Sequence, residues 1–286
     1  MSVIVGTRGS ALALAQARIV AGRIEGPSEI RVIHTAGDAT SAPLRELGDG
    51  VFVAAIERAL AEGAIDVAVH SLKDLPTAER DDLVLAAILE REDPRDVLIT
   101  RTRGGLASLP ADGVVGTSSP RRAAFLRALV PGIVTREIRG NVDTRLRKVS
   151  GGDYDATVLA LAGMRRLGLA VAEREILSLA ECPPAPGQGA LAVQCRRADA
   201  ALAARLARLD HVPTRLAVTA ERALLPRLGA GCSLALGAHG RAAGDTIVLD
   251  AALATDEGIL RASVSGRDPE EVAGRAAASL RAPAHA

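Results

Sequence analysis

Cys232 is the residue of this sequence with the clearest potential for covalent chemistry. It lies in the glycine-rich segment Gly229-Ala230-Gly231-Cys232-Ser233. Because glycines leave the chain flexible and sterically open, a bulky reaction partner could reach a thiol at this position. The same composition is typical of an ordinary turn, so the interpretation of Cys232 as a nucleophile depends on what the rest of the chain supplies.

Arginines stand beside helix-capping residues at three predicted junctions between a strand and a helix. The junctions are Gly6-Thr7-Arg8-Gly9-Ser10, Gly116-Thr117-Ser118-Ser119-Pro120-Arg121-Arg122 and Arg139-Gly140-Asn141-Val142-Asp143-Thr144-Arg145. Ser10, Ser119 and Asn141 are the predicted N-caps. Each junction combines unpaired backbone N–H groups, the positive end of a helix dipole and a guanidinium, all of which suit an anion. The sequence has no phosphate-binding loop pattern, so carboxylates are the expected ligands.

Asp74 follows the predicted strand 65–70 and precedes Pro76. In an open α/β sheet the carboxyl ends of the strands meet in one crevice, where the capped junctions are also expected. A carboxylate there could stabilise a substrate cation or relay a proton, and neighbouring arginines should lower its pKa and favour the ionised form. The plainer alternatives are a turn residue for Asp74, solvated surface charges for the arginines and a structural role for His70.

Short β-rich runs alternate with helical patterns in the first part of the chain. One series has strands at 3–7, 29–34 and 65–70, with helices from about Ser10 and Val51. A second series has strands at 114–116, 133–138 and 156–160, with helices from Ser119 and Asn141. This alternation predicts βαβ units, an α/β fold and mainly parallel sheets.

The Pro/Gly-rich segment 182–189 cannot continue a helix or a central strand, so it is predicted to be a hinge, as is the charged segment 90–95. Beyond it, the sequence predicts a strand at 190–195, a helix at 214–228, strands at 236–241, 246–254 and 259–265, and a helix from about 269. These later elements predict a small C-terminal α+β domain that carries Cys232.

Composition narrows the expected partners. The 286 residues are 48% hydrophobic, which is enough for several cores. With 35 basic against 34 acidic side chains, and with only Phe52, Phe125 and Tyr154 as aromatics, neither nucleic acid nor a membrane is an expected partner. Three cysteines without disulfide or zinc spacing should be reduced thiols. Because no run is long enough to span a membrane and no signal sequence is recognised, a cytoplasmic protein is expected.

Eight segments, taken in order, resemble the porphobilinogen deaminase family, also called hydroxymethylbilane synthase. They are Thr7-Arg8-Gly9-Ser10, Ala68-Val69-His70-Ser71-Leu72-Lys73-Asp74-Leu75-Pro76, Glu90-Arg91-Glu92-Asp93-Pro94-Arg95-Asp96, Gly116-Thr117-Ser118-Ser119-Pro120-Arg121-Arg122, Arg139-Gly140-Asn141-Val142, Leu159-Ala160-Leu161-Ala162-Gly163, Gly187-Gln188-Gly189-Ala190 and Gly231-Cys232. The resemblance covers nearly the whole chain. It implies three domains: residues 1–91 with a returning segment at 188–209, residues 92–187, and residues 210–286. The first two would be similar to the lobes of a periplasmic-type binding protein, with the active site in the cleft between them.

The resemblance also implies the chemistry. It implies a cytoplasmic, monomeric transferase of haem and other tetrapyrrole (porphyrin) biosynthesis that joins four porphobilinogen molecules into hydroxymethylbilane, losing one ammonia per unit, without a metal. A dipyrromethane cofactor, built from substrate, would be bound to Cys232 through a thioether, and Asp74 would be the catalytic residue that stabilises cationic, azafulvene-like intermediates. The implied cofactor contacts are Lys73, Ser119, Arg121, Arg122 and Arg145. The implied substrate contacts are Arg8, Ser10, Phe52, Arg139, Arg145 and Arg166.

The chain departs from the family pattern in one loop and has two rival interpretations. Ala36 replaces an arginine, and a lysine before Phe52 is replaced or displaced near Asp49, which leaves open what the loop contributes to substrate binding. Pro120 replaces a leucine but suits the first position of a helix. A non-catalytic protein that closes two lobes on an anion would leave Cys232 without a role. A thiol-dependent hydrolase would need a histidine partner for Cys232 that the sequence does not identify.

Overall fold

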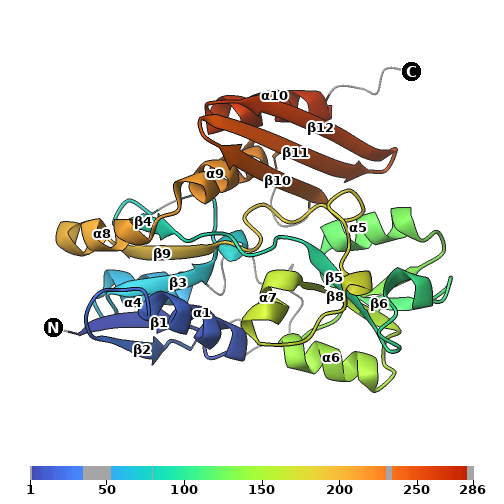
Figure 1. Ribbon diagram of the computed structural model, residues 1–286, viewed down its shortest axis with the longest axis horizontal. Coiled ribbons are helices and arrows are strands. Elements are labelled where there is room, and N and C mark those ends of the chain that lie inside the picture. The colour runs from blue at the N-terminus through green and yellow to red at the C-terminus, as the bar shows by residue number, and fades with distance from the viewer. Residues whose placement is uncertain (1, 35–52, 79, 230–233, 282–286) are drawn as a thin grey trace. The chain divides into compact units, whose positions relative to one another are not determined.

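The computed structural model describes residues 2–34, 53–78, 80–229 and 234–281 (Figure 1). The chain divides into two compact units, each formed from two separate stretches of sequence. Unit 1 comprises Met1–Glu92 and Gly189–Leu216, and unit 2 comprises Asp93–Gln188 and Ala217–Ala286. The finer division into three domains, at 1–91 with 188–209, 92–187 and 210–286, stays a prediction.

Unit 1 is built on a five-stranded mixed sheet. Strands β2, β1 and β3 are parallel, whereas β9 pairs antiparallel with both β3 and β4. The strand order is β2 (Ser28–Val32), β1 (Val3–Thr7), β3 (Val67–Ser71), β9 (Leu191–Arg196) and β4 (Leu83–Ile88). The helices are α1 (Ala11–Ala21), α4 (Ala54–Ala61) and α8 (Ala200–Leu206), with 3-10 helices η1 (Leu72–Asp74) and η4 (Ala207–Leu209).

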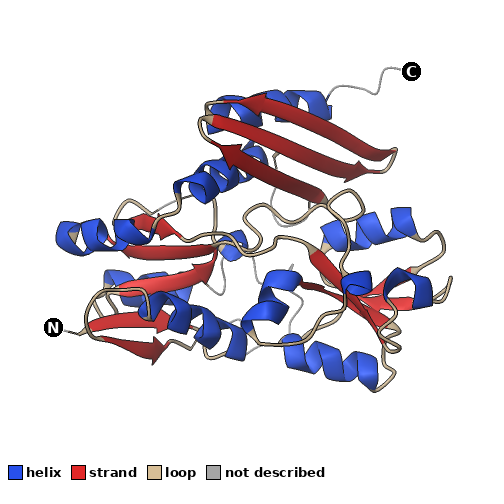
Figure 2. Ribbon diagram, in the orientation of Figure 1, coloured by secondary structure: helices blue, strands red, loops and turns tan. Residues whose placement is uncertain are grey.

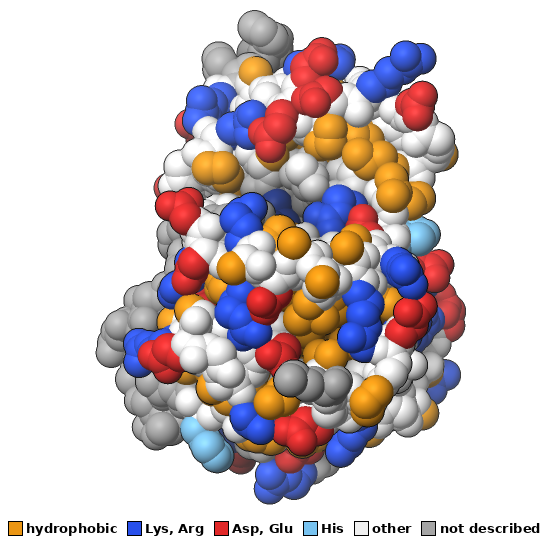
Figure 3. Space-filling view, turned by 90° about the vertical axis from the view of Figure 1, so that its left-hand side faces the viewer, with side chains coloured by type: hydrophobic (Ala, Val, Ile, Leu, Met, Phe, Trp, Pro, Cys, Tyr) orange, Lys and Arg blue, Asp and Glu red, His pale blue; other side chains and the backbone are white. Residues whose placement is uncertain are grey.

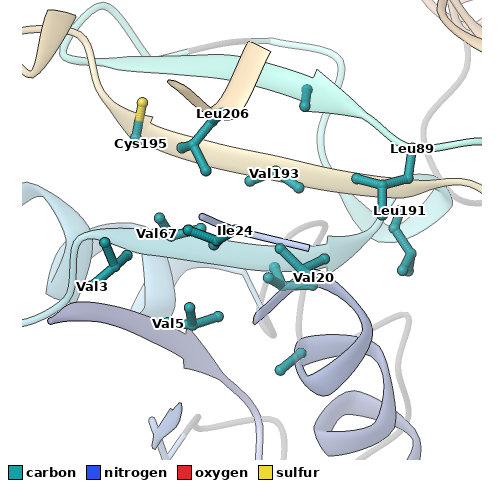
Figure 4. Close-up of a cluster of buried hydrophobic side chains, with 13 residues drawn as sticks. Val3, Val5, Val20, Ile24, Val67, Leu89, Leu191, Val193, Cys195 and Leu206 are labelled. Carbon is teal, nitrogen blue, oxygen red and sulfur yellow. The ribbon is translucent and has the colours of Figure 1, made fainter. Parts of the chain in front are cut away.

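Side chains of β3 alternate between two buried cores on opposite faces of this sheet. Val67 and Val69 belong to a core that also contains residues of α1 and α8 (Figure 4). Ala68 instead packs in a second core with Ile56 of α4. A strand that is buried on both faces is typical of a sheet covered by helices on both sides, so the end of β3 is held firmly from two directions.

The second sheet lies in unit 2 and has four strands. Their order is β5 (Asp96–Thr100), β8 (Ala156–Ala160), β6 (Val114–Gly116) and β7 (Val134–Arg136). Strand β6 is parallel to β8 and β7, and β5 is antiparallel to β8. The accompanying helices are α5 (Pro120–Leu129), α6 (Val142–Ser150), α7 (Leu161–Arg166), η2 (Gly105–Ser108) and η3 (Glu173–Glu175). Phe125 of α5 and Met164 of α7 lie in separate buried cores.

The C-terminal part of unit 2 is a three-stranded antiparallel sheet with helix α10 (Figure 2). Its strands are β10 (Leu236–Ala243), β11 (Thr246–Thr255) and β12 (Gly258–Gly266), and the helices before and after it are α9 (Val212–Arg227) and α10 (Pro269–Arg281). Val272, Ala276 and Leu280 of α10 are buried, and their spacing places them on one face of the helix.

The predicted α/β class is confirmed, and both α/β sheets are mixed. The pairs that β9 and β5 make are antiparallel, and the remaining pairs are parallel. The strands at 3–7, 114–116 and 156–160 have the bounds that the sequence predicts. Strands β4 and β5, on either side of the charged segment 90–95, are not among the predicted elements.

The two boundaries of unit 1 meet at a backbone hydrogen bond. The N–H of Glu92 donates to the carbonyl oxygen of Gly189 at 3.2 Å. Gly189 has a φ of +91°, and a Cβ atom there would lie 2.3 Å from the carbonyl oxygen of Glu92. A side chain at this position would therefore clash, and glycine allows the predicted hinge segments 90–95 and 182–189 to meet at these residues.

Candidate active site

A small pocket of unit 1, about 80 Å³ in volume, lies where β1 and β3 end and α1 begins. Its lining includes Thr7 and Ser71, the last residues of these strands. Arg8, Ser10 and Asp74, all singled out from the sequence, also line it. The carboxyl ends of two parallel strands thus bring three predicted site residues together, as expected for an α/β sheet.

Ser10 is the N-cap of α1, as the sequence predicts. Its backbone is extended, and its Oγ accepts a hydrogen bond from the N–H of Ala13 at 3.2 Å. The hydroxyl of Thr7 donates to the carbonyl oxygen of Ala13, also at 3.2 Å. These contacts fix the first turn of α1 beside the pocket, where the positive end of the helix dipole favours a negatively charged ligand.

Asp74 is exposed and ends η1, the short turn that follows β3. The turn is closed by a hydrogen bond from the N–H of Leu75 to the carbonyl oxygen of Leu72 at 3.2 Å. Both leucines are buried, whereas Lys73 between them is half-buried. Because the apolar side of the turn is anchored in the core, the Asp74 carboxylate is left at the pocket, where a ligand can reach it.

His70 lines the same pocket but is 5% exposed. Burial lowers its pKa to about 4, and the neighbouring Gln194 side chain opposes this shift only in part. The imidazole is therefore neutral at physiological pH and adds no positive charge to the pocket that Asp74 lines. This agrees with the structural role that the sequence suggests for His70.

In unit 2, Arg121 and Arg122 share one buried carboxylate, that of Asp96. The Nη2 of Arg121 lies 2.7 Å from Asp96 Oδ2, and the Nη2 of Arg122 lies 2.7 Å from Asp96 Oδ1. Asp96 is fully buried, and the two arginines are 4% and 7% exposed. Burial alone would raise the pKa of Asp96, but the attraction and hydrogen bonds of the two guanidiniums outweigh it and hold the pKa well below its usual range.

The N-termini of α5 and α6 differ in how they are capped. At α5, the Oγ of Ser119 accepts a hydrogen bond from the N–H of Arg122 at 3.4 Å, and Pro120 occupies the first turn, as predicted. At α6, the predicted cap Asn141 makes no side-chain capping hydrogen bond. Instead, Arg145 Nε donates to the carbonyl oxygen of Gly140 at 2.8 Å.

Arg145 is half-buried among other cations of unit 2. Burial, followed by the charges of Arg122 and Arg139, lowers its pKa to about 10. Glu137, 4.0 Å from Arg139, is exposed, and no carboxylate in the described part of the chain lies within ion-pair distance of Arg145. Arg145 remains protonated at neutral pH, so this group, which we call the cationic cluster (Arg122, Arg139 and Arg145), has positive charge left over for an anion.

The remaining predicted residues are placed less fully. Arg166 is half-buried in the last turn of α7. Phe52, Cys232 and the altered loop around Ala36 and Asp49 lie outside the described residues. Among residues 2–34, 53–78, 80–229 and 234–281, no group of histidine, cysteine and acidic side chains is arranged to hold a metal ion. None of the helices described is long and apolar enough to cross a membrane.

Asp96 is a buried residue of this region that the sequence does not single out. It ends a segment that resembles the family, but its sequence neighbours are charged, so the segment reads as a solvated hinge. Its partners Gln188 and Cys182 come from the second hinge segment, far along the chain. The only local signal is the apolar run that follows Asp96, which begins a buried strand.

Comparisons with known proteins identify the family of this chain. The family profile described as "Porphobilinogen deaminase, dipyromethane cofactor binding domain" matches residues 3–204, and "Porphobilinogen deaminase, C-terminal domain" matches residues 215–282. A porphobilinogen deaminase of Mycobacterium leprae is 53% identical over 82% of this chain and 75% of its own length. That of Nocardia farcinica is 48% identical over 96% of this chain and 84% of its own length.

Solved structures give more distant matches. A putative methionine-binding lipoprotein from Bacillus subtilis has a TM-score of 0.44 and 12% identity, over 73% of this chain and 89% of that protein. The two family profiles together span both units of the chain. On the strength of these profile matches and of the closely similar relatives, this chain belongs to the porphobilinogen deaminase family of enzymes.

Proposed function

We propose that this enzyme joins four porphobilinogen molecules head to tail into hydroxymethylbilane, with release of one ammonia per unit. Each pyrrole of the growing chain carries an acetate and a propionate, so the chain is a polyanion. The observation that carries the proposal is the cationic cluster, in which Arg145 is half-buried beside Arg122 and Arg139. An arriving carboxylate relieves the repulsion among these cations, and partial burial strengthens its attraction to them.

The same cluster fits the dipyrromethane cofactor, which also carries several carboxylates. Arg122 and Arg145 of the cluster, with Arg121, Ser119 and Lys73, would hold these carboxylates. When bound, the dipyrromethane supplies the pyrrole carbon to which the first substrate is joined. Arg8, Ser10, Phe52, Arg139, Arg145 and Arg166 are proposed to bind the substrate pyrroles.

Asp74 is the proposed catalytic residue. Loss of ammonia from the aminomethyl group of porphobilinogen leaves a positively charged pyrrole, and an exposed carboxylate at the pocket stabilises that charge. After the new carbon–carbon bond forms, the attacking pyrrole carbon must lose a proton. Asp74 can accept it and pass it to solvent, because the side chain is not enclosed.

Cys232 is the proposed point of cofactor attachment, and the chemistry of the other two cysteines supports this. Burial raises the pKa of Cys182 to about 12, and burial also raises the pKa of Cys195. Both thiols are fully buried, and the thiolate is the reactive form, so neither is a good nucleophile. The glycines beside Cys232 favour access to its thiol.

We further propose that the chain works as a cytoplasmic monomer on small molecules, without nucleic acid or a membrane. Thioether formation requires a reduced Cys232, and Cys182 and Cys195 are free thiols, which fits a reducing compartment. On the face drawn in Figure 3, basic and acidic side chains are interspersed. Such a mixed distribution does not favour binding to nucleic acid or to an anionic membrane. Sedimentation of the purified protein measures its molecular mass in solution and so tests the proposal that it is a monomer.

Intact-mass spectrometry and an assay with porphobilinogen test the proposed function. The parent chain should carry the added mass of two pyrrole units on the peptide that contains Cys232, and should form hydroxymethylbilane. Cys232→Ser should abolish both, whereas the matched control Cys195→Ser should retain both. An adduct on another peptide contradicts the assignment to Cys232, and a parent chain with neither adduct nor product contradicts the function itself.

A further inference from the structure

The carboxylate of Asp96 is the centre of a buried hydrogen-bond network in unit 2. Oδ1 accepts from Arg122 Nη2 at 2.7 Å and from Gln188 Nε2 at 2.9 Å. Oδ2 accepts from Arg121 Nη2 at 2.7 Å and from the thiol of Cys182 at 3.5 Å. Both oxygens are therefore fully engaged, and the carboxylate has no access to solvent.

Each of the two guanidiniums is held on two sides. The Nη1 of Arg122 donates to the carbonyl oxygen of Val158 at 2.9 Å, and the Nη1 of Arg121 donates to that of Pro183. With Asp96 on Nη2, this contact fixes the plane of each fork. The Nε of each arginine is buried and has no hydrogen-bond partner in the described part of the chain. A buried N–H without a partner is costly, so the arrangement of the two forks depends on the contacts that their Nη atoms make with Asp96 and the two carbonyl oxygens.

Asp96 also sets the balance of charge. One carboxylate faces two buried guanidiniums, so the three groups together carry one net positive charge. The charge of Arg122 repels that of Arg145 and contributes to the lowered pKa of Arg145. Without Asp96, two uncompensated cations would be buried beside each other, and both would be driven from their present positions.

We infer that Asp96 is a positioning residue that holds the forks of Arg121 and Arg122 in the geometry that receives the carboxylates of the cofactor and of the growing chain. This inference rests on the proposed function. It assigns Asp96 no contact with substrate; its effect is exerted through the two arginines. Gln188 and Cys182 complete the carboxylate's hydrogen bonds and tie the segment 182–188 to the same centre.

Asp96→Glu is the decisive variant, because it keeps the charge balance and displaces both forks by about one bond length. A displacement of this size can lower catalytic efficiency as much as 10²-fold. We expect a folded protein whose fraction carrying the two-pyrrole adduct falls, and whose KM for porphobilinogen rises at least about tenfold, more than kcat falls. Asp93→Asn is the matched control, since Asp93 is ion-paired with Arg95 at 2.7 Å and is not a hydrogen-bond partner of Asp96. It should keep the parental adduct fraction and KM.

Asp96→Asn gives a second test when it is combined with a substitution that restores the net charge of the buried group. The double variant Asp96→Asn/Arg121→Gln again has one net positive charge in the buried group. It should regain the thermal midpoint that Asp96→Asn loses, yet not the parental adduct fraction. A folded Asp96→Glu with parental adduct and KM overturns the inference. Failure of Asp96→Glu and of the double variant to fold also overturns it, in favour of a purely structural Asp96. If the parent itself forms no adduct, it is the proposed function that fails.

Discussion

Asp74 of unit 1 and Asp96 of unit 2 are both aspartates near arginines, yet their surroundings are opposite. Asp74 is exposed on a short turn and lines a pocket with Arg8. Asp96 is fully buried, and both of its oxygens are engaged by arginines and by neighbouring polar groups. The difference separates two roles for the same side chain: an accessible carboxylate can act on a substrate, whereas a saturated one can only hold the residues around it.

The largest effect expected from this comparison is on stability, at Asp96. Asp96→Asn leaves two buried guanidiniums without an anion, so the free energy of unfolding at pH 7 should fall by about 3–5 kcal/mol. Because the pKa of Asp96 is held well below its usual range in the folded chain, its contribution is complete above about pH 4 and is lost as the pH falls further. Denaturant unfolding across this range should show the parent and the variant converging in acid. Equal stability at pH 7 would contradict the buried network.

Asp74 should show the reverse pattern, with a large effect on catalysis and little on stability. Asp74→Asn removes the negative charge and preserves the shape, so turnover should fall by about 10²–10³-fold, the scale of losing one preorganised electrostatic group. The thermal midpoint should stay at the parental value, because the side chain is exposed. Steady-state assays and thermal melts of the same preparation check both. Near-parental turnover in a variant of confirmed mass would remove Asp74 from the mechanism.

His70 extends the comparison to a buried group in the pocket of Asp74. Its pKa is about 4 in the folded chain and about 6.5 when unfolded, so the unfolded chain binds more protons between these values. Protonation of His70 in the unfolded chain therefore lowers the free energy of unfolding as the pH falls below 6.5, by roughly 3 kcal/mol at pH 4. His70→Gln should flatten this part of the stability profile, measured by denaturant unfolding at each pH. An unchanged slope would mean that His70 is protonated in the folded state.

The smallest effect is expected within the cationic cluster. Arg145→Lys keeps the charge but loses the planar fork, so it should slow cofactor assembly or elongation by about tenfold and stall the chain at particular lengths. Arg122→Lys and Arg139→Lys should stall it at different lengths if each arginine serves its own carboxylate. Covalent intermediates formed with limiting porphobilinogen can be resolved by mass.

Arg147→Lys is the matched control for Arg145→Lys on the same helix. Arg147 is largely exposed and pairs with Asp143 one turn away, so its replacement should leave the intermediates unchanged. If all the cluster variants behave like Arg147→Lys, the arginines supply only general charge and the assignment of individual contacts is wrong.

Local patterns explain how much of these sites the sequence predicts. Ser10 and Ser119 are found because a capping serine bonds within its own first turn, a relation that spacing alone reveals. Asn141 occupies the N-cap position of α6 as predicted, but its side chain makes no capping hydrogen bond. The glycine before it has a φ of +111°, and its carbonyl oxygen is taken by Arg145, neither of which is visible in a list of residue types.

The role of Asp96 could not be predicted because it depends on residues far apart in the chain. Whether a carboxylate in a charged segment is solvated or buried is decided by the strand that follows it and by the segment that packs over it. Cys182 and Gln188, which complete its hydrogen bonds, belong to a segment that the sequence describes only as a hinge. Local spacing singles out the two arginines, but it does not reveal the buried carboxylate with which they pair.

The position of β9 has a consequence for how the chain is made. In the sheet of unit 1, β9 lies between β3 and β4, although Leu191–Arg196 follows them by about a hundred residues. All four strands of the second sheet lie between Asp96 and Ala160. A ribosome working from the N-terminus therefore releases every strand of the second sheet before it releases the strand that completes the first. The sheet of unit 1 is begun before the second sheet and completed after it, and a message cut short before Leu191 would encode a first sheet that lacks the strand between β3 and β4.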